Sequence, residues 1–169
     1  MNIFDFALKM ELDGENYYRE LAAKAKCQGL KVVLGGLADD EQRHYKIVQA
    51  LQNRSVNPYL AADPAVSNAR NGFEPGMNKT FIPKDKDSIA KLKAEQLDLY
   101  QAALLKEEES IQTYKKLKET AGQQVEKDSI EKLVHEEEKH AEVLGNIIQM
   151  LNHANEWVES AEFNHNKPY

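Results

Sequence analysis

The sequence has little of what marks several large protein classes. Its single cysteine, Cys27, excludes an internal disulfide framework, a paired-cysteine zinc site and a four-cysteine iron site. No apolar run approaches the roughly 18 residues of a membrane span, and no basic segment followed by an apolar run opens the chain as in an ordinary secretory signal. With only 8 glycines and 5 prolines in 169 residues, collagen-like and low-complexity classes are also excluded.

Positive charge is also scarce. The 22 lysines and arginines are outnumbered by 28 aspartates and glutamates, which gives a net charge of −6. We therefore expect no nucleic-acid partner and no membrane partner. A chain of 169 residues is long enough to bury a core. The composition predicts one acidic, cytoplasmic domain.

Helical periodicity divides the chain into two blocks. Four of the five prolines fall between the blocks, and no segment alternates with the period of a strand. Each block is interrupted once near a glycine, at 27–29 and at 121–123. Asn2 and Ser88 are candidate N-caps. We predict helices near 3–27, 30–53, 88–121 and 124–152.

The predicted fold is all-α: a four-helix bundle of two helical hairpins, which occupies residues 1–153. A long crossover over about 54–87 joins the second helix to the third. It is long enough to return along a helix, so these two helices should run parallel. The remaining residues, 154–169, form a C-terminal tail with room for a short helix.

An internal repeat relates the two blocks. A shift of 96 residues aligns them without a gap and superposes Glu11 on Glu107, Tyr18 on Tyr114, Glu41 on Glu137, and His44 on His140. Glu-x-x-His alone is weak evidence, because Glu162 and His165 also fit it in a polar tail, where we interpret it as coincidence. The shared offset is strong evidence, since packing gives no reason to retain matching carboxylates and imidazoles.

Simple geometry brings these residues together. Residues three apart share one side of a helix, and residues equidistant from the turn of an antiparallel hairpin are level. The midpoint of Glu11 and Glu41 is residue 26, and that of Glu107 and Glu137 is residue 122. Both midpoints fall at the breaks between helices, so the two glutamates of each hairpin should lie level with each other. Four buried carboxylates need compensation, which two divalent cations would supply. Carboxylate and imidazole ligands suit iron or manganese.

With these motifs, the sequence resembles the ferritin-like superfamily over about residues 3–153, and most of all its rubrerythrin-related branch of small di-iron proteins. The resemblance implies two iron ions, with manganese or zinc as substitutes. Their ligands would be Glu11, Glu41, His44, Glu107, Glu137 and His140. It also implies that Glu41 and Glu137 bridge the metals and that Glu11 and Glu107 are terminal. Without metal, the mean pKa of the four carboxyl groups should rise.

The residues next to the predicted ligands allow two interpretations, one structural and one functional. Tyr18 and Tyr114 are either core tyrosines or, as their position favours, catalytic residues behind the ligands. Asp40 and Glu136 each precede a ligand glutamate. They lie either at the surface or against the opposite histidine, with Glu136 on His44 and Asp40 on His140, because a metal-bound imidazole needs its other nitrogen held. We expect solvent exposure for Glu108, Glu109, Glu138, His135, His153 and His165, and packing on the bundle or a partner for Trp157 and Phe163.

The sequence departs from full rubrerythrins at two places. It lacks the rubredoxin domain with four cysteine ligands, which implies an external electron donor such as a rubredoxin-type protein. Ser110 stands where the family has a further glutamate. We predict an oxidoreductase that reduces peroxide or dioxygen, and by resemblance a homodimer. The alternatives are a ferroxidase of iron handling and a helical interaction module with a structural metal site.

Overall fold

The computed structural model describes residues 2–56, 87, 90–91 and 94–164. These residues form four long helices, α1 (Ile3–Lys24), α2 (Gln28–Val56), α5 (Leu97–Thr120) and α6 (Gln124–Asn164). The described residues include no strand. The chain is therefore the all-α bundle of two helical hairpins that the sequence predicts.

The first helix begins where the sequence predicts. The side chain of Asn2 accepts a hydrogen bond from the backbone N–H of Asp5 at 2.8 Å, and the Asp5 carboxylate accepts one from the N–H of Asn2 at 3.4 Å. This reciprocal pair satisfies backbone donors that have no partner inside the helix. The second predicted cap, Ser88, lies outside the described residues.

The third long helix begins nine residues later than predicted, at Leu97. Gln96 before it has an extended backbone with φ −87° and ψ 101°. The Glu95 carboxylate accepts hydrogen bonds from the backbone N–H groups of Lys26, at 2.6 Å, and Cys27, at 3.2 Å. This tertiary contact holds the start of α5 at the turn between α1 and α2, which local sequence preferences do not reveal.

The fourth helix is longer than predicted and continues to Asn164. The predicted end near 152 is wrong, because residues 153–164 contain neither glycine nor proline and continue the helix without a break. Most of the predicted tail is thus the last part of α6. The side chains of Trp157 and Phe163, and all of His165, lie outside the described part of the chain.

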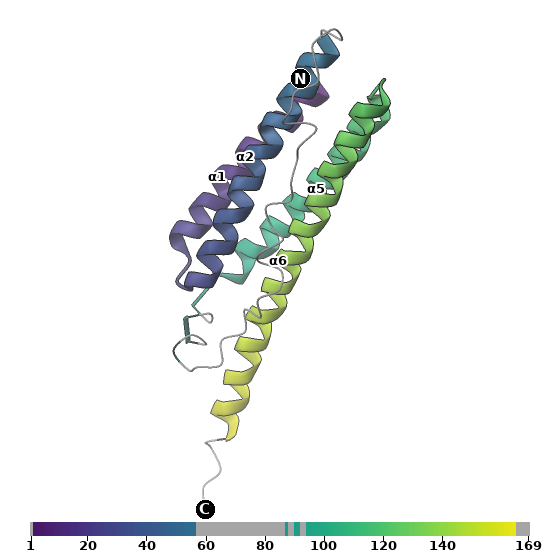
Figure 1. Cartoon of the computed structure of the whole chain (residues 1–169). Coiled ribbons are helices and arrows are strands. Elements are labelled where there is room, and N and C mark those ends of the chain that lie inside the picture. The colour runs from purple at the N-terminus through teal and green to yellow at the C-terminus, as the bar shows by residue number, and fades with distance from the viewer. Residues whose placement is uncertain (1, 57–86, 88–89, 92–93, 165–169) are drawn as a thin grey trace, which may run out of the picture.

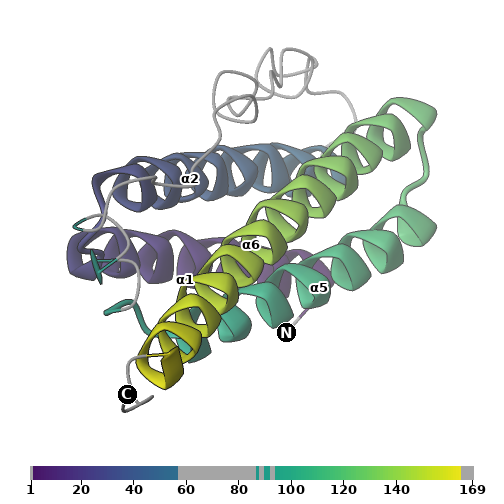
Figure 2. The ribbon, with the colours of Figure 1, turned by 90° about the horizontal axis from the view of Figure 1, so that it is seen from below.

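Contacts between helices fix their directions. In the two hairpins, Gln52 of α2 reaches Asp5 of α1, and Lys118 of α5 reaches Glu131 of α6. Across the bundle, α1 pairs antiparallel with α5. The second and third long helices, α2 and α5, therefore run in the same direction, as predicted from the long crossover (Figure 1). Viewed from below, the α5/α6 hairpin runs obliquely to the α1/α2 hairpin (Figure 2).

The buried apolar residues form two clusters, one toward each end of the bundle. On α2, for example, Leu30, Leu34 and Leu37 belong to the first cluster, and Ile47 and Leu51 belong to the second. On each of the four helices, the buried acidic residues separate the residues of one apolar cluster from those of the other. A polar layer thus crosses the middle of the bundle between two apolar cores.

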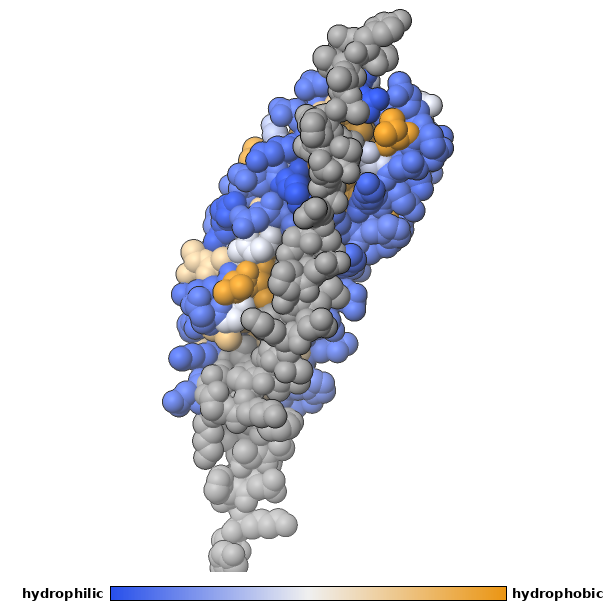
Figure 3. Space-filling model, viewed as in Figure 1, coloured by the Kyte–Doolittle hydropathy of each residue, from blue (hydrophilic) through white to orange (hydrophobic). Residues whose placement is uncertain are grey.

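The outer surface is dominated by hydrophilic side chains on the face shown in Figure 3. Among the described residues, no helix combines the length and apolar character that crossing a bilayer requires.

Candidate metal centre

The centre of the polar layer consists of the four glutamates and two histidines that the repeat superposes. Each helix contributes one glutamate, and α2 and α6 each add a histidine one turn later. None of the six residues is more than 4% exposed. They are Glu11, Glu41, His44, Glu107, Glu137 and His140.

These six residues form two overlapping groups that can each hold a metal ion. The first group is Glu11, Glu41, His44 and Glu137, and the second is Glu41, Glu107, Glu137 and His140. Within each group, one potential ligand atom per residue lies within 4.8 Å of the others. Glu41 and Glu137 belong to both groups, whereas each remaining residue belongs to one.

Several polar atoms of the cluster lack a hydrogen-bond partner although they are buried. They are Oε2 of Glu11 and both carboxylate oxygens of Glu137. Nδ1 of His44 lies 2.9 Å from Oε1 of Glu137 but does not have hydrogen-bond geometry. Buried polar atoms without partners are costly, typically about 1–3 kcal/mol each. Lone pairs left unused in the same small space are what a bound cation requires, so the residues fit a metal centre.

The charges of the cluster respond to burial in different ways. Burial and the neighbouring carboxylates raise the pKa of Glu41 well above its usual range and that of Glu107 to about 7. Burial also opposes ionisation of Glu137, but His44 and His140 outweigh it and hold the pKa of that carboxyl below its usual range. The pKa values of Glu41 and Glu107 thus shift in the direction predicted for the mean of the four carboxyl groups, whereas that of Glu137, which lies between the two imidazoles, shifts the other way.

Both histidines have raised pKa values, despite burial. Their Nδ1 atoms lie close to Glu137, at 2.9 Å from His44 and 3.2 Å from His140, and these and other carboxylates favour the charged imidazolium. In the metal-free protein, protons on the imidazoles thus take over part of the charge compensation that metal ions provide.

The outer nitrogen of each histidine reaches an acid on the opposite helix. Nε2 of His44 lies 2.8 Å from Glu136, and Nε2 of His140 lies 3.4 Å from Asp40. Both acids are buried, with exposed fractions of 6% and 4%. Of the two readings that the sequence leaves open, the structure supports contact with the histidines, and these contacts turn each Nδ1 toward the cluster.

Arg43 connects these two acids and is a residue that the sequence analysis does not identify. Its guanidinium donates to Asp40 at 2.6 Å and to both oxygens of Glu136 at 2.6 and 3.1 Å. Against the effect of burial, hydrogen bonds from the histidines and Arg43 keep the pKa values of Asp40 and Glu136 low. The only sequence signal was a basic residue at the third motif position in both halves, Arg43 and Lys139.

Two buried tyrosines cross-connect the hairpins. The hydroxyl of Tyr18 on α1 donates to Glu107 on α5, and the hydroxyl of Tyr114 on α5 donates to Glu11 on α1. Burial first, and then the adjacent carboxylates, raise the pKa of both phenols. Both phenols therefore stay neutral, and each donates to one carboxylate oxygen of its own glutamate partner. The second oxygen of Glu11 has no hydrogen-bond partner and remains available to the cluster.

The acids and histidines that we expect at the surface are found there. Glu108, Glu109, Glu138, His135 and His153 are exposed. The repeat therefore separates Glu107 and Glu137 from exposed glutamates close to them in the sequence.

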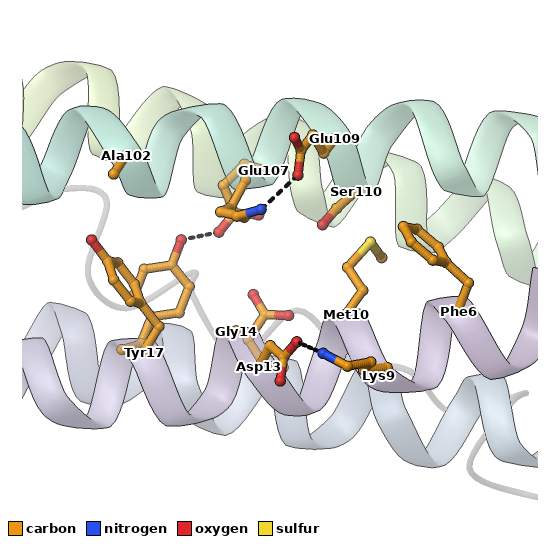
Figure 4. Close-up of a pocket in the computed structure, with 13 residues that line it drawn as sticks. Phe6, Lys9, Met10, Asp13, Gly14, Tyr17, Ala102, Glu107, Glu109 and Ser110 are labelled. Atoms are coloured by element: carbon orange, nitrogen blue, oxygen red, sulfur yellow. Dashed lines mark hydrogen bonds and ion pairs between the residues drawn. The ribbon is translucent and has the colours of Figure 1, made fainter.

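A cavity of about 400 Å³ opens between α1 and α5, beside Glu41 and Glu107 (Figure 4). Gly14 and Ser110 both line it, and the 96-residue repeat superposes these two positions. A Cβ atom at position 14 would lie 3.4 Å from the Glu41 carboxylate. The sequence analysis notes Ser110 but does not predict a cavity there.

A four-helix bundle with a buried carboxylate and imidazole cluster between two hairpins defines a ferritin-like protein with a candidate metal centre. The rubrerythrin family model matches residues 2–148, which include all six cluster residues. The chain therefore belongs to the rubrerythrin family. Neither the curated proteins nor the solved structures include a significant match to it.

Proposed function

We propose that this protein is a non-haem di-iron oxidoreductase that reduces peroxide or dioxygen. The observation that carries the proposal is the sharing of Glu41 and Glu137 by two ligand groups that each include one histidine. Two ions with shared carboxylates are a recurrent arrangement in helical-bundle metal sites. Iron ions bound there would supply two electrons at one place.

Each proposed ion has its own terminal pair of residues. Glu11 and His44 would hold the first ion, Glu107 and His140 the second, and Glu41 and Glu137 would bridge them. The protein contributes preorganisation: Asp40 and Glu136 fix the imidazoles, and Tyr18 and Tyr114 fix the terminal carboxylates. These contacts exist without metal, so little rearrangement is needed on binding.

These 169 residues cannot form a rubredoxin-type electron donor. Their one cysteine cannot build the four-cysteine site of a rubredoxin domain. The proposal therefore includes an external donor, such as a rubredoxin-type protein, that returns the oxidised centre to the reduced state. A cytoplasmic homodimer stays a prediction.

Anaerobic titration with Fe(II) tests the proposed site. We expect wild-type protein to bind two ions per chain, and one equivalent of hydrogen peroxide to oxidise both, because each peroxide accepts two electrons. Glu137→Ala removes a shared ligand and should abolish binding of the second ion. Glu138→Ala, which changes the exposed neighbour, is the matched control and should bind both.

Two results would contradict the proposal. Uptake of fewer than two ions by the wild-type protein would show that the cluster is not a dinuclear site. Full uptake followed by Fe(II) oxidation that continues well beyond two ions per chain would instead identify a ferroxidase.

A further inference from the structure

The cavity between α1 and α5 has a larger volume than a hydrogen peroxide molecule requires. It encloses about 400 Å³, within the range of about 300–1,000 Å³ typical of sites for organic ligands. A water molecule occupies about 30 Å³ in the liquid, so hydrogen peroxide, with two oxygen atoms, would fill only a small part of the cavity. Its size leaves room for a molecule with a substantial organic portion.

The walls and the inner end of the cavity differ in chemistry. Phe6 and Met10 of α1 and Ala102 of α5 make the walls largely apolar, and Ala102 lies on the opposite side of Glu107 from Phe6 and Met10 (Figure 4). The inner end carries Glu41, Glu107 and the hydroxyl group of Ser110. A suitable ligand therefore has an apolar body and one polar end that points at the candidate metal centre.

The rim of the cavity favours neutral molecules. Lys9 pairs with Asp13 at 2.5 Å, and Lys106 pairs with Glu109 at 2.8 Å, so each basic residue is neutralised by an acid of its own helix (Figure 4). The rim thus carries no excess of either charge to select a phosphate, a carboxylate or an amine. A neutral ligand loses least when it leaves water for such walls.

The cavity approaches the cluster from the side away from the histidines. The outer nitrogens of His44 and His140 bind acids on α6 and α2, so the imidazoles lie between those helices. The cavity is lined by α1 and α5 together with Glu41 of α2. Because position 14 is a glycine, no Cβ atom stands against Glu41 on this approach.

Building on the peroxide reduction proposed above, we propose that this cavity binds neutral organic hydroperoxides, with the peroxide group at Glu41 and Glu107 and the organic group against Phe6 and Met10. In the reaction, the O–O bond would break on accepting two electrons, which bound ferrous ions would supply by becoming ferric. Two protons from solvent would complete one alcohol and one water molecule. Ser110 is placed to hydrogen-bond the polar end of the ligand.

Binding is tested without any turnover, in protein loaded with zinc. The probe is 2-phenyl-2-propanol, the alcohol that cumene hydroperoxide yields, and the readout is the NMR signal of ¹³C-labelled methionine methyl groups. We expect a saturable shift of Met10, assigned with Met10→Leu, and none of Met150, which packs in the apolar cluster at the other end of the bundle. Absence of a saturable Met10 shift would overturn the inference.

Two tryptophan variants localise the ligand. Glu109→Trp places a large ring in the cavity from an exposed position, and Glu108→Trp places the same ring on the neighbouring exposed residue, outside the cavity. We expect the Met10 shift to disappear in Glu109→Trp and to persist in Glu108→Trp. An equal shift in both variants would show that the alcohol binds elsewhere and would overturn the inference.

Oxidation of the di-ferrous protein separates this inference from the proposed function. We expect Glu109→Trp to lower the ratio of the rate constants for cumene hydroperoxide and hydrogen peroxide by about tenfold or more, because one filled pocket position commonly has such an effect. Glu108→Trp should keep the wild-type ratio. Rapid oxidation by hydrogen peroxide with no reaction of cumene hydroperoxide would overturn the inference alone, whereas no oxidation by either would overturn the proposed function.

Discussion

At the scale of single residues, Arg43 supports both halves of the centre at once. Its guanidinium binds Asp40 and Glu136, and these acids hold His140 and His44. The matching residue of the other half is Lys139. A planar guanidinium can serve two carboxylates with a fixed geometry that an ammonium group does not offer. The pseudo-symmetric centre thus depends on one asymmetric residue.

Replacing Arg43 should therefore destabilise the protein. Arg43→Met removes the guanidinium from two buried carboxylates and leaves them only their histidine contacts, and we expect unfolding in urea to show a loss of about 1–3 kcal/mol. Arg19→Met is the control, since Arg19 pairs with Glu15 and Asp39 at the surface, where ion pairs contribute at most about 1 kcal/mol. Equal losses in the two variants would contradict a special role of Arg43.

The two cluster tyrosines give a second prediction at this scale. Tyr18→Phe and Tyr114→Phe each remove the hydroxyl that positions a terminal glutamate. Residues that hold metal ligands commonly affect metal affinity by about 10–100-fold, and we expect a loss of this size for each variant. Competition with a chelator measures it. Tyr45→Phe, on α2 outside the cluster, should keep wild-type affinity, and a similar loss there would refute the assignment.

At the scale of elements, the start of α5 depends on a contact from another hairpin. Glu95 accepts hydrogen bonds from two backbone N–H groups at the turn between α1 and α2. This contact joins the end of the crossover to the first hairpin. It also explains why a helix start predicted from local caps alone was nine residues too early.

Loss of this contact should free the turn. In Glu95→Ala, hydrogen exchange at the amides of Lys26 and Cys27 should be faster than in wild type, with a stability loss of about 1 kcal/mol. Gln96→Ala is the matched control, because Gln96 occupies the N-cap position of α5 without a side-chain capping bond. Unchanged exchange in Glu95→Ala would show that the two hydrogen bonds do not hold the turn.

At the scale of the whole molecule, the two apolar clusters enclose a layer of ionisable groups. Without metal, the folded state binds more protons than the unfolded state at Glu41, Glu107, His44 and His140, because their pKa values are raised. Stability falls with rising pH wherever the folded state holds the extra protons. The stability of the metal-free bundle is therefore linked to pH.

We expect the Tm of metal-free protein to fall between pH 5 and pH 8. Glu107 contributes as pH rises from the ordinary value of 4.5 to about 7, and the histidines contribute above their ordinary 6.5. Glu137, Asp40 and Glu136 act oppositely but lose their effect only below about pH 4.5, since their pKa values are lowered. Differential scanning calorimetry measures this trend, and a Tm that rises from pH 5 to pH 8 would contradict it.

Metal loading should reverse the trend. Ligands must lose their protons to bind metal, so binding releases protons and strengthens as pH rises. The gain in Tm from zinc or iron should accordingly be larger at pH 8 than at pH 6, by mass action. A gain independent of pH would show that the imidazoles and Glu107 do not bind metal.

The sequence by itself determined the number of long helices, their pairing into hairpins and the six residues of the polar layer. Helical periodicity, glycine and proline breaks and a repeat of constant offset are local or arithmetic properties, so they need no knowledge of packing. The repeat even distinguished Glu137 from its identical neighbours. Because the repeat superposes Glu41 on Glu137, the sequence could only predict the same role for both residues.

Only the tertiary structure decided what depends on distances between helices. It placed Arg43 between two acids, set Glu137 between two imidazoles so that its pKa falls while that of Glu41 rises, and opened a cavity at Gly14 and Ser110. It also moved the start of α5 through Glu95. These features arise from contacts across the bundle, where a difference of one ångström changes an interaction, and a repeat in the sequence carries no information at that scale.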